Sequence, residues 1–233
     1  MDLYLVRHGL STANVDGRVQ GHWDTELTAE GLRQAGATGR FLAHYFAGLG
    51  VPVAALYSSD LKRAWHTAQA IGRILGQDPQ PDPALREMHT GLAAGLTGAE
   101  WAASYPGYQA GWHNRADLDW GWPGGETRRQ FNKRVVRAMT AIVARHRPDD
   151  QVLVVTHSGF IQAYIHTAVT RDPDQLGTPV RTGNCSITHV QFSPAGDALG
   201  AGCLITLNHT AHLHDLPDAA DDLAASSPEA QGA

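Results

Sequence analysis

Short apolar runs alternate with longer amphipathic stretches along most of this chain. Residues 3–6 (LYLV), 53–59 (VAALYSS) and 151–159 (QVLVVTHSG) are segments of strand length that contain apolar runs. Continuous apolar runs of this kind are typical of strands that are buried on both faces of a parallel sheet. Two later runs, 184–194 and 202–210, predict a final pair of strands around a turn at 194–196.

Between the predicted strands, apolar positions recur at helical spacing, which predicts helices over residues 27–50, 61–76, 126–147 and 160–169. In the first helix the apolar face consists of Leu32, Ala35, Phe41, Leu42 and Tyr45. We expect Asp60 to cap the second helix and the basic residues of the third to point outward. Residues 81–91 are expected to be extended because of their prolines, and residues 98–106 to form a short helix.

This alternation of strands and helices predicts an α/β fold, a three-layer sandwich with a mostly parallel central sheet flanked by helices on both faces. We expect one domain over residues 1–214. The remaining residues, 215–233, contain five acids and no Lys or Arg, and they are expected to form a disordered acidic tail.

Composition and charge argue against some classes of function, namely nucleic-acid binding and insertion into a membrane. The formal net charge of the chain is −5, but without the tail 18 acids face 18 bases, so we expect no nucleic-acid-binding face. No stretch reaches the roughly 20 apolar residues of a membrane helix, and the N-terminus does not resemble a signal peptide. We therefore expect a cytoplasmic protein without membrane partners, in which Cys185 and Cys203 are buried thiols.

The residues that follow the predicted strands are unusual. Arg7, His8 and Gly9 follow the first strand, Arg63 lies just after the second, and His157 lies just past the apolar run of the strand at 151–159. Ligand sites of open α/β sheets lie at the carboxyl ends of the strands, so these groups are expected to meet in one pocket. Such a cluster of cations suits a phosphate dianion, and it would lower the pKa of His8 and keep its imidazole neutral and nucleophilic.

Five segments in the same order resemble the histidine phosphatase superfamily, which is also called the phosphoglycerate mutase-like family. They are LVRHGLSTAN (5–14), SSDLKRAWHTA (58–68), LREMHTGLAAGLTG (85–98), WPGGET (122–127) and VVTHSGFI (154–161). The Gly-Gly-Glu segment is similar to one that is common in phosphatase members of the family. The resemblance extends from residue 1 to about residue 214.

The resemblance implies a metal-independent phosphomonoesterase that acts on a small phosphorylated metabolite without a cofactor. It implies that His8 is the nucleophile and becomes phosphohistidine. Glu87 would protonate the leaving oxygen and then take a proton from water. Arg7, Arg63 and His157 would bind the phosphoryl group. The implied substrate-binding residues are Asn14, Gln20, Gly21 and Ser158. Relatives commonly form homodimers, so a homodimer is also possible here.

Two other functions are compatible with the same motifs. A cofactor-dependent phosphoglycerate mutase would return the phosphate to the product. However, the insert that follows residues 85–98, the acid segment that carries Glu87, contains only Arg115 where mutases have paired arginines. A catalytically silent member would bind phosphorylated ligands, but silent members usually lack one of the five catalytic groups, and all five are present. Hydrolysis is therefore the favoured function.

Two further groups of residues have several interpretations. The aromatic-rich segment 101–122 is expected to pack in the core or in a lid, with a wall of the substrate site as the alternative. His209, His212 and His214 have spacings that a metal site could use, but no Cys or acid set completes the ligands, so we expect no metal there. At the position of His209, many members of the family that this sequence resembles have an Asp.

Overall fold

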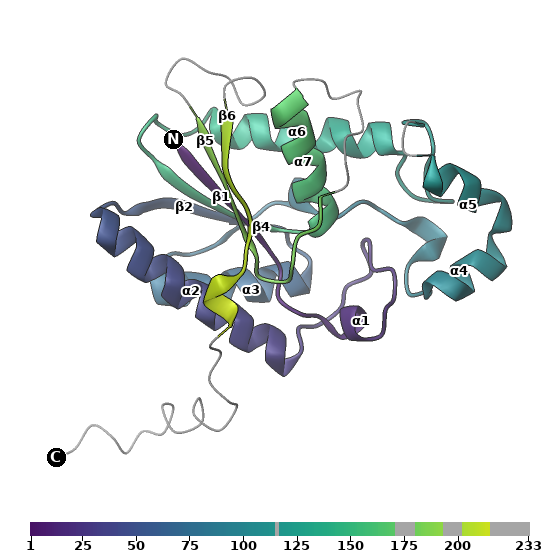
Figure 1. The fold of residues 1–233 in the computed structure, drawn as a ribbon, viewed down its shortest axis with the longest axis horizontal. Coiled ribbons are helices and arrows are strands. Elements are labelled where there is room, and N and C mark those ends of the chain that lie inside the picture. The colour runs from purple at the N-terminus through teal and green to yellow at the C-terminus, as the bar shows by residue number, and fades with distance from the viewer. Residues whose placement is uncertain (115–116, 171–179, 193–201, 215–233) are drawn as a thin grey trace.

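The computed structural model describes residues 1–114, 117–170, 180–192 and 202–214 and shows the predicted α/β sandwich (Figure 1). Six strands form one sheet in the order β3-β2-β4-β1-β5-β6. Their bounds are β1 Asp2–Arg7, β2 Val53–Ser58, β3 Gln80–Pro81, β4 Gln151–Thr156, β5 Ile187–Phe192 and β6 Gly202–His209. The sheet is mostly parallel, as predicted, and only the pairs β1–β5 and β5–β6 are antiparallel.

The central strands β1 and β4 are the apolar runs that the sequence contains, and every residue of β4 is buried. In the parallel register, Arg7 lies opposite Thr156, and Ser58 of β2 lies opposite Val155. The carboxyl ends of the three strands therefore coincide at one edge of the sheet. The groups that follow each strand are brought together there.

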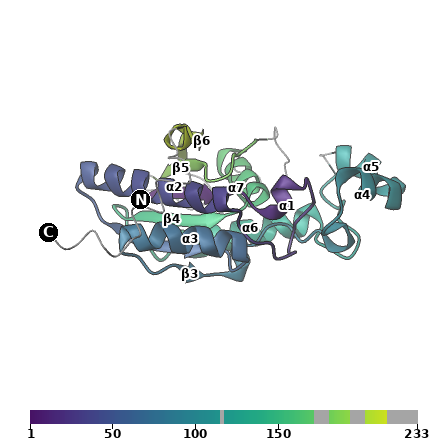
Figure 2. The ribbon, with the colours of Figure 1, turned by 90° about the horizontal axis from the view of Figure 1, so that it is seen from below.

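Helices cover both faces of the sheet (Figure 2). The described helices are α1 Thr12–Val15, α2 Ala29–Leu49, α3 Lys62–Leu75, α4 Gly98–Ser104, α5 Pro106–His113, α6 Arg128–Val143 and α7 Ser158–Thr170, with short 3-10 helices η1 Pro83–Leu85, η2 Gly91–Ala93 and η3 Ala211–Leu213. Apolar residues of α2 and α3 pack on one face, and those of α6 and α7 pack on the other. Helices α4 and α5 lie to one side of the sheet in both views.

Six local expectations were wrong. Residues 83–85, within the stretch that was expected to be extended, form η1, because proline is tolerated at the first position of a helix. Arg134 of α6 binds backbone carbonyls and Glu126 instead of pointing outward. The side chain of Asp60 does not cap α3, because it binds Arg86 and the N-cap position is Leu61. Leu32 is half exposed, since the buried face of α2 includes Gly31 and Ala35 and Leu32 lies beside it. Arg128 at the start of α6 is buried instead of pointing outward, because it donates to backbone carbonyls of the preceding loop. Cys185 is buried as expected, but Cys203 is exposed on β6, and both are free thiols.

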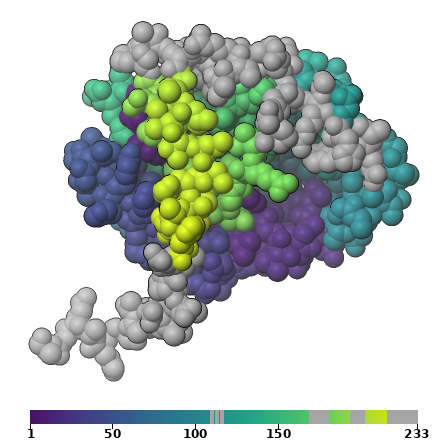
Figure 3. All heavy atoms as spheres, in the orientation of Figure 1, coloured from purple at the N-terminus to yellow at the C-terminus, as the bar shows by residue number. Residues whose placement is uncertain are grey.

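Some sequence expectations lie outside the described residues: the turn at 194–196 and the tail 215–233. Within the described ranges, no helix combines the length and the apolarity that crossing a membrane requires. Figure 3 shows β6 and η3 at the surface of the molecule.

Candidate active site

His8 is the first residue after β1 and is almost completely buried, with 3% of its surface exposed. Its backbone N–H donates to the carbonyl of Thr156 at 2.9 Å. The Nδ1 atom of its ring lies 2.8 Å from the carbonyl oxygen of Gly9. A carbonyl can only accept a hydrogen bond, so Nδ1 carries the proton and Nε2 keeps the lone pair. Nε2 is therefore the nucleophilic atom of this imidazole.

The turn that follows His8 is fixed from several directions. The N–H of Gly9 donates to Oγ1 of Thr67 on α3 at 3.0 Å. Two residues just before β5, Asn184 and Cys185, also form hydrogen bonds with the backbone around His8. The N–H of Cys185 donates to the carbonyls of Arg7 and His8, and Nδ2 of Asn184 also donates to the carbonyl of His8. Cys185 adopts a positive φ of 54°, which turns its N–H towards β1. The backbone around His8 is thus held by segments far apart in the sequence.

Two guanidinium groups lie beside His8. Arg63, in the first turn of α3, is 1% exposed and donates to the carbonyls of Gly21 and Trp23 at 2.8 and 3.0 Å. Arg7 donates to the carbonyl of Thr182 at 2.6 Å. Among the described residues, the Nε atoms of both arginines have no hydrogen-bond partner. Burial lowers the pKa of Arg63 to about 10, so it stays charged at neutral pH.

His157 follows β4 and lies close to His8, with 5.2 Å between the ring centroids. It is fully buried, and its Nε2 lies 2.8 Å from Oγ of Ser59, at the end of β2. Burial and the neighbouring cations Arg63 and Arg7 hold the pKa of His8 well below its usual range, and the same causes lower the pKa of His157. Both imidazoles are therefore neutral at physiological pH.

Glu87 faces the two histidines from the segment between η1 and η2. Its carboxylate accepts the N–H of Met88 at Oε1 and the N–H of Gly159, in the first turn of α7, at Oε2, both at 2.9 Å. A Cβ on Gly159 would lie 2.3 Å from Oε1 of Glu87. Glycine is thus required at this position for Glu87 to lie where it does.

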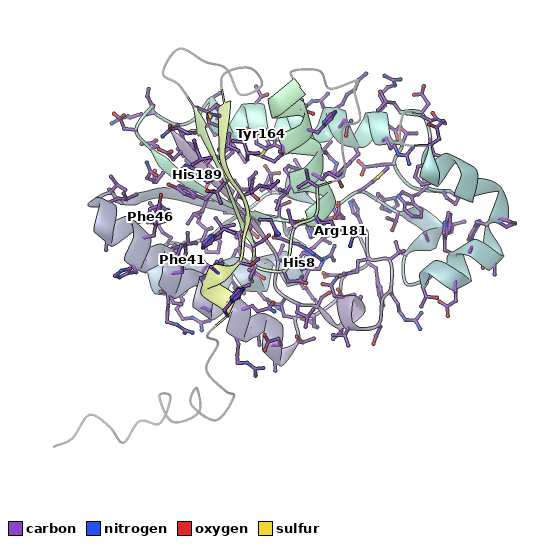
Figure 4. All side chains as sticks on the ribbon, in the orientation of Figure 1. His8, Phe41, Phe46, Tyr164, Arg181 and His189 are labelled. Carbon is purple, nitrogen blue, oxygen red and sulfur yellow. The ribbon has the colours of Figure 1, made fainter. Side chains whose placement is uncertain are left out.

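These groups surround a cavity of about 320 Å³. Seven of the nine residues predicted from the sequence line it: Arg7, His8, Gln20, Gly21, Arg63, Glu87 and Ser158. In Figure 4, His8 lies near the middle of the molecule, at the end of the strands. Gln20 accepts two hydroxyl hydrogen bonds at Oε1, which leaves its amide N–H groups for a ligand. Gly21 has a positive φ of 49°, and a Cβ there would collide with Thr90.

The other two predicted residues lie just behind the cavity wall. His157 adjoins the ring of His8. Asn14 belongs to α1, where its Oδ1 accepts from Ser11 and from Nδ2 of Asn184. Since Asn184 also binds the carbonyl of His8, Asn14 supports the turn that carries the imidazole.

Apart from Trp122 of the aromatic segment, the far wall of the cavity was not predicted from the sequence. It contains apolar side chains, amides, a histidine and an arginine, namely Met88, Trp122, Arg128, Phe131, Asn132, Gln162 and His166. Both interpretations of the aromatic segment apply, because Trp101 and Trp120 pack in a buried cluster and Trp122 belongs both to that cluster and to the wall. The side chain of Trp112 lies outside the described part of the chain.

Ser59 and Thr182 are polar contacts of the site that sequence reasoning missed. Ser59 binds His157, and Thr182 binds Arg7 through its carbonyl and Ser158 through its hydroxyl. Ser59 is the last residue of the predicted second strand and directly follows β2, so its position at a strand end could have identified it. Thr182 precedes β5 in a segment without such a signal.

His209 and His212 pack with each other and with an aromatic residue of α2. Their rings stack on each other and on Phe41 of α2, with centroids 5.0 to 5.5 Å apart. Nε2 of His212 lies 3.0 Å from Oγ1 of Thr38. Burial and the neighbouring His209 lower the pKa of His212 to about 4, so this ring is neutral. His214 is exposed at the end of η3.

Comparison with known proteins agrees with this geometry. The model of the histidine phosphatase superfamily (branch 1) matches residues 3–201. Glucosyl-3-phosphoglycerate phosphatase of Mycobacterium tuberculosis (strain CDC 1551 / Oshkosh) is 37% identical over 69% of this chain and 72% of its own length. Metal-independent phosphoserine phosphatase of Arabidopsis thaliana is 36% identical over 73% of this chain and 69% of its own.

The fold also has a close solved counterpart. The structure of mycobacterial glucosyl-3-phosphoglycerate phosphatase in complex with VO3 superimposes with a TM-score of 0.78 and is 31% identical. The superposition covers 90% of this chain and 99% of that one. The similarity therefore extends over nearly the whole of the described sandwich.

Proposed function

The chain belongs to branch 1 of the histidine phosphatase superfamily, and we propose that it is a metal-independent phosphomonoesterase that works through a phosphohistidine at His8. One observation carries this proposal. A neutral imidazole with its lone pair on Nε2 lies beside two buried guanidinium groups, in the cavity that also contains Glu87. This arrangement joins a nucleophile, a phosphate-binding pair of cations and a proton donor.

In the first step, Nε2 of His8 attacks the phosphorus atom of the substrate. The bond between phosphorus and the ester oxygen breaks, and Glu87 gives its proton to the departing alcohol. Arg7 and Arg63, which line the cavity, offer their guanidinium groups to the oxygens of the transferring phosphoryl group. Positive charge already fixed in place stabilises the charge of the transition state without reorganisation.

In the second step, the carboxylate of Glu87 takes a proton from a water molecule whose oxygen attacks phosphorus. The bond between phosphorus and Nε2 breaks, and inorganic phosphate leaves with His8 restored. The two amide hydrogen bonds from Met88 and Gly159 keep Glu87 in one place for both steps. One carboxyl group can thus serve as acid and then as base.

The far wall indicates the class of substrate. Apolar and aromatic faces alternate there with amides that can bind hydroxyl groups. Glu87 is the only carboxylate among the described residues that line the cavity, so a leaving group with an ammonium has no other acidic partner there. We therefore infer that a hydroxyl-rich leaving group, such as that of a glycosylated phosphoglycerate, is preferred over phosphoserine, although relatives are named for both.

The test is a phosphate-release assay over a panel of phosphomonoesters with EDTA present. We expect release despite the chelator, with sugar-bearing phosphates above phosphoserine in kcat/KM. Loss of activity with EDTA would contradict the metal-independent mechanism. Isomerisation of 3-phosphoglycerate that depends on 2,3-bisphosphoglycerate, without phosphate release, would identify a mutase, and the absence of both reactions in folded protein would identify a silent binding member.

Replacing Glu87 by glutamine tests its role as proton donor. We expect kcat/KM for alkyl phosphates to fall by about 100-fold, within the usual range for general acid catalysis. For aryl phosphates such as p-nitrophenyl phosphate the loss should be much smaller, because a nitrophenolate leaves without protonation. Steady-state kinetics on both substrate types measures the difference. Equal losses on both would exclude Glu87 as the acid.

A further inference from the structure

The Gly-Gly-Glu segment has no role in the chemistry above, yet it packs directly against the segment that carries Glu87. The N–H of Glu126 donates to the carbonyl of His89, and the N–H of Leu92 donates to the carbonyl of Pro123. A Cβ on Gly125 would lie 2.2 Å from the carbonyl oxygen of His89. This glycine therefore allows the two backbones to approach closely, two residues from the acid.

Glu126 binds the acid segment with its side chain as well. Its Oε2 accepts the N–H of His89 at 2.8 Å. Both carboxylate oxygens accept from Arg134 of α6, at 2.9 and 2.7 Å, in the paired geometry that arginine forms with carboxylates. Burial opposes the charge on Glu126, but the hydrogen bonds from Arg134 and His89 outweigh it and hold its pKa below the usual value.

Arg134 extends this contact along the backbone next to the acid. Its NH1 donates to the carbonyls of Ala84 and Arg86, at 3.0 and 2.7 Å, and its NH2 donates to the carbonyl of Glu87 at 2.9 Å. Together with the two bonds to Glu126, these use all five N–H donors of the guanidinium. Three carbonyls of the acid segment are thus turned towards α6, while the carboxylate of Glu87 lines the cavity.

We propose that Arg134 and Glu126 are positioning residues for Glu87: as one ion pair, they hold the backbone of residues 84–89 so that its carboxylate meets the N–H of Gly159. Neither residue is among the described residues that line the cavity. The inference rests on the proposed function, because Glu87 needs a precise position only if it moves a proton. A displacement of about 1 Å in a catalytic group can cost about 100-fold in rate.

The first test compares leaving groups in Glu126→Gln and Arg134→Lys. Glutamine removes the charge and one acceptor, and lysine keeps the charge but cannot reach five acceptors. We expect the ratio of kcat/KM for p-nitrophenyl phosphate to kcat/KM for glycerol 3-phosphate to rise by about tenfold or more in both variants. Arg137→Gln, an exposed arginine on the same helix, is the matched control and should leave the ratio unchanged.

A combined variant sharpens this test. In Glu87→Gln the acid is already absent, so adding Glu126→Gln should not raise the ratio further. Equal losses on both substrates in the single variants, or a further rise in the combined variant, would overturn the inference while leaving the proposed function intact. A folded wild-type enzyme that releases phosphate from neither substrate, and from no other phosphomonoester of the panel, would overturn the proposed function itself.

Amide hydrogen exchange gives a readout that does not depend on turnover. We expect the amides of residues 84–92 to exchange faster in Glu126→Gln and Arg134→Lys than in the wild type, and at the wild-type rate in Arg137→Gln. Unchanged exchange in this segment would show that the ion pair does not hold it, and would overturn the inference whatever the kinetics.

Discussion

Replacing His8 by alanine is expected to lower kcat/KM for every phosphomonoester by at least about 10⁴-fold, the scale of losses seen when a catalytic nucleophile is removed. Without Nε2 the phosphoryl group has no covalent acceptor, and a single displacement by water must replace the two easier steps. The arginines and Glu87 would remain in the cavity, so substrate binding should be weakened far less than turnover. Steady-state kinetics and the affinity for inorganic phosphate measure these two effects separately.

A phosphoenzyme measurement accompanies the kinetics. The wild type, quenched during turnover of a labelled substrate, should retain label that is lost in acid and stable in alkali, as expected for phosphohistidine. The His8→Ala variant should retain none. His44→Ala removes an exposed histidine of α2 and should behave like the wild type. Label that persists in folded His8→Ala protein would assign the nucleophile to another residue.

Replacing Arg63 by lysine is expected to lower kcat/KM by about 100-fold or more, comparable to the loss of a preorganised transition-state donor. The guanidinium is held by the carbonyls of Gly21 and Trp23, with its Nε among the buried atoms that have no partner in the described residues. A lysine ammonium cannot reproduce this planar arrangement, and one carbonyl would lose its donor. Burial also lowers the pKa of an amine, which weakens its charge further.

The control for this substitution lies on the same helix. Arg73→Lys changes an exposed arginine near the end of α3 and should leave kcat/KM within about twofold of the wild type, as expected for a surface substitution away from the site. The affinity for vanadate, measured as inhibition, should fall in Arg63→Lys and not in the control. Activity of Arg63→Lys close to that of the wild type would show that a point charge is sufficient at this position.

The fold was predictable because its signals are local. The predicted strand 151–159 begins with β4 and extends three residues beyond its end, and the predicted helix 61–76 differs from α3 by one residue at each end. The errors occurred where a side chain has a distant partner. Asp60 fits a helix cap by its type and position, but Arg86 lies within 2.7 Å and binds it instead. Arg134 looks like a solvent-facing base, but it meets carbonyls about 50 positions earlier in the chain.

The site was predictable in part for the same reason. His8, Arg63 and His157 follow strands that end at one edge of the sheet, so strand order alone brings them together. Glu87 has no such signal in its own segment, and only the family resemblance identified it. Its position depends on Gly159, 72 residues later, through one hydrogen bond. The far wall depends on how α6 and α7 pack, which the sequence pattern does not specify.

The place of β1 in the sheet has a consequence for how the protein is made. Both neighbours of β1 come much later in the chain, since β4 begins at Gln151 and β5 at Ile187. A growing polypeptide on the ribosome therefore carries a complete, apolar β1 with neither strand to pair with until most of the protein has been synthesised. The hydrogen bonds to the backbone carbonyl of His8 also cannot form until Asn184 and Cys185 have been synthesised. A prematurely terminated product that ends before these residues would contain the nucleophile but not the hydrogen bonds that hold it, and its unpaired apolar strand would make it a substrate for chaperones and proteases.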